Sequence, residues 1–390
     1  MIAFIAVILT ISGLIHWFLY ARLVSALEIT SPGILWPLRL LAVLLALSYI
    51  LVRLWERIAP QPTVYVSEWT AASWIGMMFE LLWMTAVVWI IKLLLQLFGI
   101  WSRFDPAQQT MIGRWSVIVV VSAAFILCGY AMWRAAQPAR VVRANVPVKN
   151  ITPALRNLSL ALVADFHSGV LVSKKQVQRM AQQIMNLKPD AILIPGDILD
   201  HPPDRIREIA TAFRELHAPL GVFGTTGNHE YYINVRAAVA LLKESGIHML
   251  ENEAVELPPG LVIAGVDDRT ALQFRIPRPK VDEFVAAHTD GKTTILLNHT
   301  PMGDEAQSAA RAGADLIVSG HTHGGQIWPF SILTKLAFTY HHGLYKLDRG
   351  YIMTTSGIGT WGPPMRLGAP PEIVLIKLVA ENEPPMFRYE

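Results

Sequence analysis

The pattern of hydrophobic and polar positions divides the chain at about residue 135. Four apolar stretches precede this point, at residues 1–20, 34–52, 69–97 and 115–133. Each approaches or exceeds the roughly 20 residues that a helix needs to cross a bilayer. Because no basic segment precedes the first stretch and further apolar stretches follow it, a cleaved signal peptide is disfavoured. The pattern predicts a four-helix transmembrane region over residues 1–135.

Short polar breaks separate the four stretches. They carry charged residues and prolines, among them Arg22, Pro32, Arg57, Pro60 and Pro106. Tryptophans lie near the ends of the stretches, as interfacial anchors do. An even number of helices places both ends of this region on the same side of the membrane. Basic residues flank the two sides in nearly equal number, so the positive-inside rule leaves the orientation open.

Ionisable residues also lie within the apolar stretches, among them Glu80, Lys92 and His16. Glu80 and Lys92 are twelve positions apart in the third stretch. This spacing is about 18 Å along a helix, so only one of them can lie near the bilayer centre. Ionisable groups at that depth are costly and often functional. The interpretation we favour is that one or both lie near an interface and extend their charge into water. His16 is interpreted as a neutral histidine at the interface.

The pattern changes after residue 135. Residues 136–153 contain prolines and basic residues and are interpreted as a linker. Apolar runs of strand length then alternate with runs of helical spacing, which indicates a sheet covered on both faces. The predicted strands are 158–164, 191–195, 221–225, 261–266, 293–297 and 314–319, and the predicted helices are 174–187, 205–217, 235–245 and 281–288. Strands 351–355 and 372–379 follow without helices between them, so residues 154–390 are predicted to form one α/β domain.

Composition narrows the class of protein. Hydrophobic residues make up 53% of the 390 positions and charged residues 16%. An ordinary soluble chain carries about 25% charged residues. The apolar excess lies in the first third, in agreement with membrane helices. A single cysteine, Cys128, excludes an internal disulfide. The net charge of +3 is too small to indicate a nucleic-acid partner, and we expect none.

Polar residues of metal-binding type follow directly after the predicted strands. They are Asp165, His167, Asp197, Asp200, Asn228, His229, His299, His321 and His323. Ligand sites in open α/β sheets collect at the carboxyl ends of strands, so these segments are expected to converge. Residues two apart on an extended chain point to one face, so the D-x-H and H-x-H pairs can each direct two donors to one centre. Nitrogen and oxygen donors suit manganese, zinc or iron and argue against an iron–sulfur cluster.

The motifs carry a resemblance to a known family. The ordered set D-x-H, G-D-x-x-D, G-N-H-E, H and G-H-x-H resembles the calcineurin-like metallophosphoesterase superfamily over nearly all of residues 155–380. The strings L-E-N-E at 250–253, G-V-D-D at 265–268 and G-P-P-M-R at 362–366 resemble its bacterial branch of exported or membrane-tethered phosphodiesterases. The resemblance implies a four-layer αββα domain, here preceded by four transmembrane helices.

The resemblance also implies a centre of two divalent metal ions bridged by Asp197. One ion would be held by Asp165, His167 and His323, and the other by Asn228, His299 and His321. A bridging carboxylate offsets the repulsion of two close cations, and the pair can lower the pKa of a shared water. The resemblance assigns His229 to the leaving group.

Further polar residues receive secondary interpretations. Asp200 is interpreted as orienting a ligand histidine. For Arg366, contact with a substrate phosphate and a surface salt bridge stay open as alternatives. The other histidines of the domain are expected to be structural, namely His201, His217, His248, His288, His341 and His342.

These features predict a membrane-anchored, metal-dependent phosphoesterase that hydrolyses phosphodiester or pyrophosphate bonds. A tether raises the effective concentration of lipid head groups, so a lipid-linked phosphate ester is the substrate we expect. The expected location is the cell (inner) membrane, as a multi-pass protein that contacts the lipid bilayer. Two alternatives stay open. One is a phosphoesterase of soluble nucleotides or phosphoproteins. The other is a membrane sensor or transport module with a regulatory metal domain.

Overall fold

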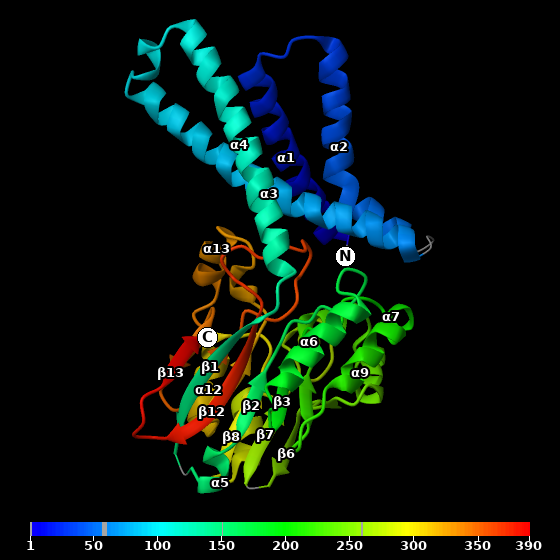
Figure 1. Ribbon diagram of the computed structural model, residues 1–390, viewed down its shortest axis with the longest axis vertical. Coiled ribbons are helices and arrows are strands. Elements are labelled where there is room, and N and C mark those ends of the chain that lie inside the picture. Colours follow the sequence, from blue (N-terminus) through cyan, green and yellow to red (C-terminus); the bar gives the residue numbers. More distant parts are fainter. Residues whose placement is uncertain (1, 57–60, 150, 259) are drawn as a thin grey trace. The chain divides into compact units, whose positions relative to one another are not determined.

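The computed structural model describes residues 2–56, 61–149, 151–258 and 260–390. Its contacts divide the chain into two compact units (Figure 1). The first, the helical unit, comprises Met1–Trp133 and Gly362–Met365. The second, the α/β unit, comprises Arg134–Trp361 and Arg366–Glu390.

Four long helices form the helical unit. They are α1 (Ile2–Leu27), α2 (Pro32–Trp55), α3 (Gln61–Leu97) and α4 (Pro106–Ala135), with a short 3-10 turn, η1, at Trp101–Arg103. Each is long and apolar enough to cross a membrane. The four predicted helices are therefore present, and they extend beyond the apolar stretches. Arg57 and Pro60, which we placed in a polar break, lie outside the described residues.

Two polar residues of these helices, His16 and Glu80, are buried in the helical unit. His16 is 5% exposed and therefore buried in the helical unit, where its Nε2 accepts a hydrogen bond of 3.0 Å from Trp74 Nε1. Its ring is thus packed inside the helical unit. Glu80 is 1% exposed and accepts a hydrogen bond of 2.7 Å from Trp83 Nε1. Lys92 is exposed, and the expectation that it or Glu80 lies near a membrane interface stays a prediction.

The α/β unit is built on two stacked sheets. The first has the order β13-β1-β12-β2-β3-β4-β5 and the second the order β10-β11-β9-β8-β7-β6. The first sheet contains β1 (Arg140–Val148), β2 (Ser159–Leu162), β3 (Ala191–Pro195), β4 (Val222–Thr225), β5 (His248–Met249), β12 (Glu372–Ala380) and β13 (Met386–Tyr389). The second contains β6 (Glu253–Leu257), β7 (Leu261–Gly265), β8 (Thr293–Leu297), β9 (Leu316–Ser319), β10 (Gly343–Lys346) and β11 (Tyr351–Thr354).

Alternation along the strands creates separate apolar cores. In β2, Leu160 and Leu162 belong to the core between the two sheets, whereas Ala161 faces a second core formed with helices. Successive side chains of a strand point to opposite faces, so one continuous apolar run can serve both cores. In β3, Leu193 and Ile194 divide in the same way. This double burial explains why the strands read as uninterrupted apolar runs.

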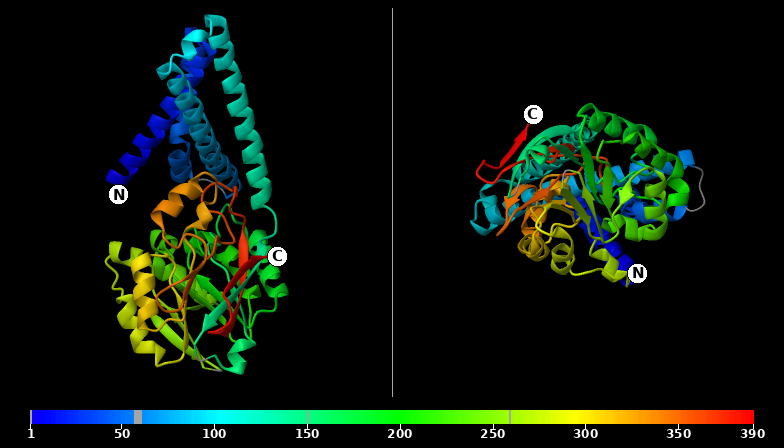
Figure 2. Two further views of the ribbon diagram at one scale, coloured as in Figure 1. Left: turned by 90° about the vertical axis from the view of Figure 1, so that its left-hand side faces the viewer. Right: turned by 90° about the horizontal axis from the view of Figure 1, so that it is seen from below.

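Helices cover the outer faces of both sheets. The outer core of the first sheet includes residues of α6 (Lys174–Asn186), α7 (Pro203–Ala210) and α9 (Val235–Glu244). That of the second includes residues of α11 (Val281–Thr289) and α12 (Gly303–Ala312). Figure 2 shows the yellow helices on one side of the strands and the green helices on the other. The unit has the four-layer αββα arrangement that the resemblance implied, with two sheets where the pattern alone indicated one.

The segment interpreted as a linker contains a strand. Within residues 136–153, β1 pairs in parallel with β12 from Arg140↔Glu372 to Val148↔Ala380, and its other edge pairs with β13. Val142, Ala144 and Val146 are buried at alternate positions. Pro147 and the intervening Arg143 and Asn145 hid this alternation in the sequence. The expected linker is thereby shortened to the residues on either side of β1.

Candidate metal centre

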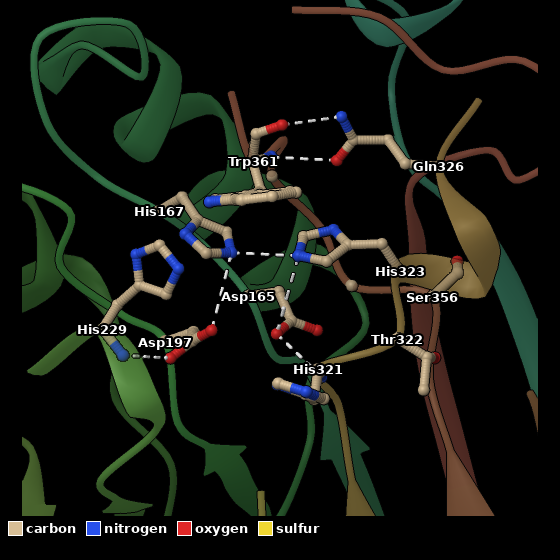
Figure 3. A network of polar contacts seen from close by, with 12 residues as sticks. Asp165, His167, Asp197, His229, His321, Thr322, His323, Gln326, Ser356 and Trp361 are labelled. Carbon is tan, nitrogen blue, oxygen red and sulfur yellow. Dashed lines mark hydrogen bonds and ion pairs between the residues drawn. The ribbon is translucent and has the colours of Figure 1, made fainter. Parts of the chain in front are cut away.

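Five segments that are distant in sequence bring polar side chains together at strand ends. Asp165 and His167 follow β2, Asp197 follows β3, Asn228 and His229 follow β4, His299 follows β8, and His321 and His323 follow β9. Strands β2, β3 and β4 are parallel neighbours in one sheet, and β8 and β9 in the other. Their carboxyl ends therefore meet at one edge of the unit (Figure 3).

The backbone at these positions is unusual. Five of the side chains sit on residues with φ between 47° and 69°, a region that favours glycine. They are Asp165, His167, Asp197, His321 and His323. Such strain concentrates at functional sites, where the surrounding fold enforces it. At Gly227 a Cβ atom would overlap the Asp197 carboxylate, so only glycine fits there.

One cluster joins Asp165, His167 and His323. The two Nε2 atoms of the histidines lie 3.0 Å apart, and His323 Nε2 lies 3.9 Å from Asp165 Oδ1. Asp165 is fully buried, and its Oδ2 has no hydrogen-bond partner among the described residues. An unsatisfied buried carboxylate oxygen is costly unless a cation takes the place of the missing donor. These side chains therefore fit a divalent cation.

A second cluster joins Asn228, His299 and His321. His321 Nδ1 lies 2.8 Å from Asn228 Oδ1 and 3.3 Å from His299 Nε2. Asp197 belongs to both clusters, because its Oδ2 lies 3.1 Å from His299 Nε2 and 3.8 Å from His167 Nε2. All seven side chains that we predicted as metal ligands thus lie in these two clusters.

Asp200 holds two histidines at once. Its Oδ1 lies 2.9 Å from His167 Nδ1 and forms an ion pair with His229 Nδ1. The contact expected of Asp200 with a ligand histidine is present. Burial acts to raise the pKa of Asp200, but the charges of His167 and His229 outweigh it and hold that pKa well below its usual value.

His229 lies next to the first cluster, and together with His167 and Asp197 it forms a further group of side chains that could hold a metal ion. Its ring centroid is 4.6 Å from that of His167. Burial lowers the pKa of His229, but the charges of Asp200 and Asp197 outweigh this effect and raise the pKa to about 9. A histidine with this pKa is protonated near neutral pH and can act as a proton donor.

Sequence reasoning missed the role of Glu230. This side chain is fully buried and accepts hydrogen bonds from the backbone N–H groups of Asp197, Ile198, Leu199 and Gly227 at 2.7 to 3.1 Å. It thereby ties the loop after β3 to the loop after β4. Burial and the charge of Asp197 raise its pKa to about 7. Its place in the G-N-H-E string was the available signal.

The position of Arg366 contradicts both roles considered for it, a surface salt bridge and a contact with substrate phosphate. It is fully buried, so it forms no surface salt bridge, and its guanidinium donates to backbone carbonyls instead of facing a substrate. The acceptors are the carbonyl oxygens of His323, Ser356, Gly357, Gly359 and Ala369. Burial lowers its pKa to about 10. Arg366 therefore fixes the loop that carries His323.

Aromatic side chains lie next to His229. Trp361 is 52% exposed, with its ring centroid 6.4 Å from that of His229 (Figure 3). The side chain of Gln326 holds the backbone of Trp361. Gln326 Nε2 donates to the Trp361 carbonyl oxygen at 2.8 Å, and the Trp361 N–H donates to Gln326 Oε1 at 2.9 Å. Tyr232 is exposed as well, and its ring centroid lies 5.6 Å from that of His229. Sequence reasoning did not single out either residue.

The remaining histidines of the domain stay outside the clusters. His342 Nε2 lies 3.1 Å from both carboxylate oxygens of the buried Glu372. His288 Nδ1 lies 2.7 Å from the carbonyl oxygen of Phe284. Among the described residues, none of the six histidines expected to be structural joins a group suited to hold a metal ion.

Comparison with known proteins agrees with this geometry. The family model for the calcineurin-like phosphoesterase matches residues 158–325. An uncharacterized metallophosphoesterase of Aquifex aeolicus is 34% identical over 231 residues, which is 58% of this chain and 87% of that protein. The chain belongs to the calcineurin-like metallophosphoesterase family.

Other relatives are longer than the matched region. An uncharacterized metallophosphoesterase of Helicobacter pylori is 35% identical over 58% of this chain and 61% of its own length. A Danio rerio protein named transmembrane protein with metallophosphoesterase domain is 32% identical over 71% of this chain and 66% of its own length. The chain thus spans about two thirds or less of these two relatives. A 5'-nucleotidase precursor from Thermus thermophilus has a TM-score of 0.37 at 15% identity, over 56% of this chain and 54% of that one.

Proposed function

We propose that this chain is a membrane-anchored hydrolase of phosphodiester or pyrophosphate bonds that works with two divalent cations, manganese, zinc or iron. The position of Asp197 carries the proposal. Its Oδ2 lies 3.8 Å from His167 Nε2 and 3.1 Å from His299 Nε2, between the two clusters. A carboxylate in this position suits two cations, because its charge offsets their repulsion.

The ligand sets follow from the clusters. Asp165, His167 and His323 would hold one cation, Asn228, His299 and His321 the other, and Asp197 both. When bound, the two cations lower the pKa of a shared water and offset the charge that develops on the phosphoryl oxygens. The chain itself supplies the orientation. Asp200 fixes the His167 ring through Nδ1, so that Nε2 is the nitrogen presented to the cluster.

His229 is the residue that we assign to the leaving group. Its Nδ1 is paired with Asp200, so Nε2 is the nitrogen that can donate a proton. Because its pKa is raised to about 9, that proton is present at neutral pH. Protonation of the departing oxygen avoids the release of an alkoxide, which is the usual contribution of a general acid. Trp361 and Tyr232 then offer ring faces to the leaving group.

The substrate class that we favour is a lipid-linked phosphate ester. The chain carries four helices that are long and apolar enough to cross a membrane. A tethered enzyme meets lipid head groups at a high effective concentration. The Danio rerio relative named as a transmembrane protein supports a membrane setting for such a domain. We therefore place the chain in the cell membrane as a multi-pass protein.

Turnover by the purified full chain with added manganese tests the proposal. The substrates are a soluble aryl phosphodiester, the matching aryl phosphomonoester, and a lipid-linked pyrophosphate in micelles. We expect hydrolysis of the diester to exceed that of the monoester, and the lipid-linked substrate to react fastest. Asp197→Asn serves as the control for contaminating enzymes. Turnover of the soluble diester equal to that of the lipid-linked substrate in micelles would refute the lipid preference, and no turnover of any of the three esters would refute hydrolysis.

A further inference from the structure

Helix α13 (Phe330–Ala337) presents its apolar side chains outward. It follows the 3-10 turn η3 (His323–Gly325), which carries one of the histidines of the metal centre. Ile332, Leu333 and Leu336 are 53%, 55% and 80% exposed. The buried side chain of this helix is Thr334. The usual orientation of an amphipathic surface helix, with apolar residues facing the core, is therefore inverted here.

Another helix of the same unit shows the usual arrangement. In α6, the buried residues are Val177, Ala181 and Ile184, and the polar residues face outward. Two aromatic residues next to or within α13 are exposed as well, Trp328 at 44% and Phe330 at 41%. We call these five exposed residues the α13 face: Trp328, Phe330, Ile332, Leu333 and Leu336. Several large apolar side chains exposed within nine residues of a folded unit indicate an interaction site.

We propose that the α13 face inserts into the boundary between head groups and acyl chains of the lipid bilayer. Its composition is that of interfacial segments, which combine Trp, Phe and Leu on one face with a basic residue beside them. Lys335 supplies the basic residue and is exposed. The occupant is thus a membrane surface, and this role is separate from the hydrolysis proposed above and does not depend on it.

The chain itself keeps a bilayer within reach. Helix α4 ends at Ala135 and β1 begins at Arg140, so residues 136–139 alone connect a candidate membrane helix to the α/β unit. Each extended residue adds at most about 3.6 Å, which limits this connection to roughly 15–20 Å. A short tether makes binding of the α13 face an intramolecular event at the surface, so a small apolar face is sufficient.

Insertion would also bring the metal centre to the lipid. His323 and the first residue of α13 are separated by residues 324–329, and Gln326 in this segment holds Trp361 beside His229. Binding of the α13 face therefore positions the aromatic residues next to His229 at the level of the head groups. A lipid-linked ester could then reach His229 without leaving the membrane.

Site-specific fluorescence tests the insertion without any need for turnover. The chain has one cysteine, so Cys128→Ala provides a background without thiols. In this background, Leu336→Cys carries an environment-sensitive dye, and the full chain is reconstituted in vesicles of phosphatidylcholine and phosphatidylglycerol with or without nitroxide-labelled lipid. The matched control is Asp282→Cys, an exposed polar position on α11, whose large apolar residues Val281, Phe284 and Val285 are buried.

We expect lipid nitroxides to quench the dye at position 336 several-fold more than the dye at 282. Adding Leu333→Glu is expected to lower the quenching at 336 towards the control, because a carboxylate opposes insertion. Equal quenching at the two positions would overturn the proposal. Energy transfer between dyes on two copies, with no quenching by lipid, would also overturn it and identify a second copy as the occupant. Either result leaves the proposed hydrolysis standing.

Discussion

The two units of this chain place their apolar side chains in opposite ways. In α2, no residue is buried, and Leu40 is 61% exposed. In β3, all five residues are buried, and Leu193 has no exposed surface. Both segments are rich in leucine and isoleucine, so composition does not explain why the side chains of α2 are exposed and those of β3 are buried. The surroundings of each segment must explain it. In the proposed membrane setting, lipid would take the place of a core around α2, whereas two layers of protein surround β3.

The two units also treat buried polar groups differently. In the helical unit, Glu80 accepts a hydrogen bond from Trp83, a neighbour on its own helix. In the α/β unit, Asp165, Asp197 and Glu230 are buried at the ends of strands and contact several segments of the chain. A concentration of buried charge at one edge of a sheet is typical of a catalytic site. The chemistry of the chain is therefore expected in the α/β unit.

Removal of divalent cations should have the largest effect, and it should affect the α/β unit and not the helical unit. We predict that treatment with a chelator lowers phosphodiester turnover by about a thousand-fold or more, since loss of one strong electrostatic contact already costs 10²–10³. The helical unit holds none of the Asp and His groups suited to a metal, among the described residues. Its helix content by circular dichroism in detergent should not change. Turnover that survives complete chelation would contradict the account.

Replacement of the proposed proton donor has the next largest effect. We predict that His229→Ala lowers kcat for an alkyl phosphodiester by about 10²–10⁴-fold, the usual contribution of a general acid. An ester with a nitrophenol leaving group needs less protonation and should lose far less. The ratio of the two losses is the measurement. Equal losses for both esters would show that His229 acts through the structure and not on the leaving group.

A matched pair of leucine truncations tests the packing difference directly. Leu193→Ala should lower the free energy of unfolding of the α/β unit by about 2–5 kcal/mol, because it leaves a cavity between the sheets. Leu40→Ala exchanges contact with lipid for contact with lipid, so we predict a change below about 1 kcal/mol. Thermal unfolding of both variants in the same detergent measures the contrast. A larger shift for Leu40→Ala would mean that α2 is packed against protein.

Exchange of the membrane helices should have the smallest effect. If residues 1–135 are replaced by an unrelated membrane anchor, we predict that kcat/KM for a soluble diester stays within about two-fold, because none of the proposed ligands lies in that region. A loss of activity with an intact metal content would favour the alternative in which the helices perform the principal task and the metal domain regulates them.

Much of this organisation could be predicted from the sequence. Strands β3 and β8 have the predicted bounds, because continuous apolar runs between polar residues leave little freedom. The gathering of the seven ligand candidates at one place could also be predicted, because each lies shortly after a strand; their role as ligands stays a prediction. Spacing alone could not reveal β1, whose buried Val142, Ala144 and Val146 alternate with Arg143 and Asn145 and whose partner β12 lies more than 220 positions later. Two strands so far apart along the chain leave no pattern within a short stretch of sequence that would predict their pairing.

Other features depend on tertiary contacts. Arg366 was expected either to contact a substrate phosphate or to form a surface salt bridge, yet it is buried and donates to five backbone carbonyls from two segments of the chain. Glu230 gave no sign of its four backbone donors, since these come from two separate loops. The apolar residues of α13, which face outward, have the same spacing along the sequence as apolar residues that face a protein core. Periodicity shows that a helix has two faces, and the packing decides which of them is buried.

Metal content of the purified chain tests the central claim most directly. After loading with manganese and removal of free metal, elemental analysis should find two ions per chain, and Asp197→Ala should retain fewer than one, because the account places this carboxylate between both ions. Asp282→Ala, an exposed residue far from the ligand set in sequence, is the control and should retain two. Retention of two ions by Asp197→Ala, or a single ion in the unaltered chain, would contradict a centre built around Asp197.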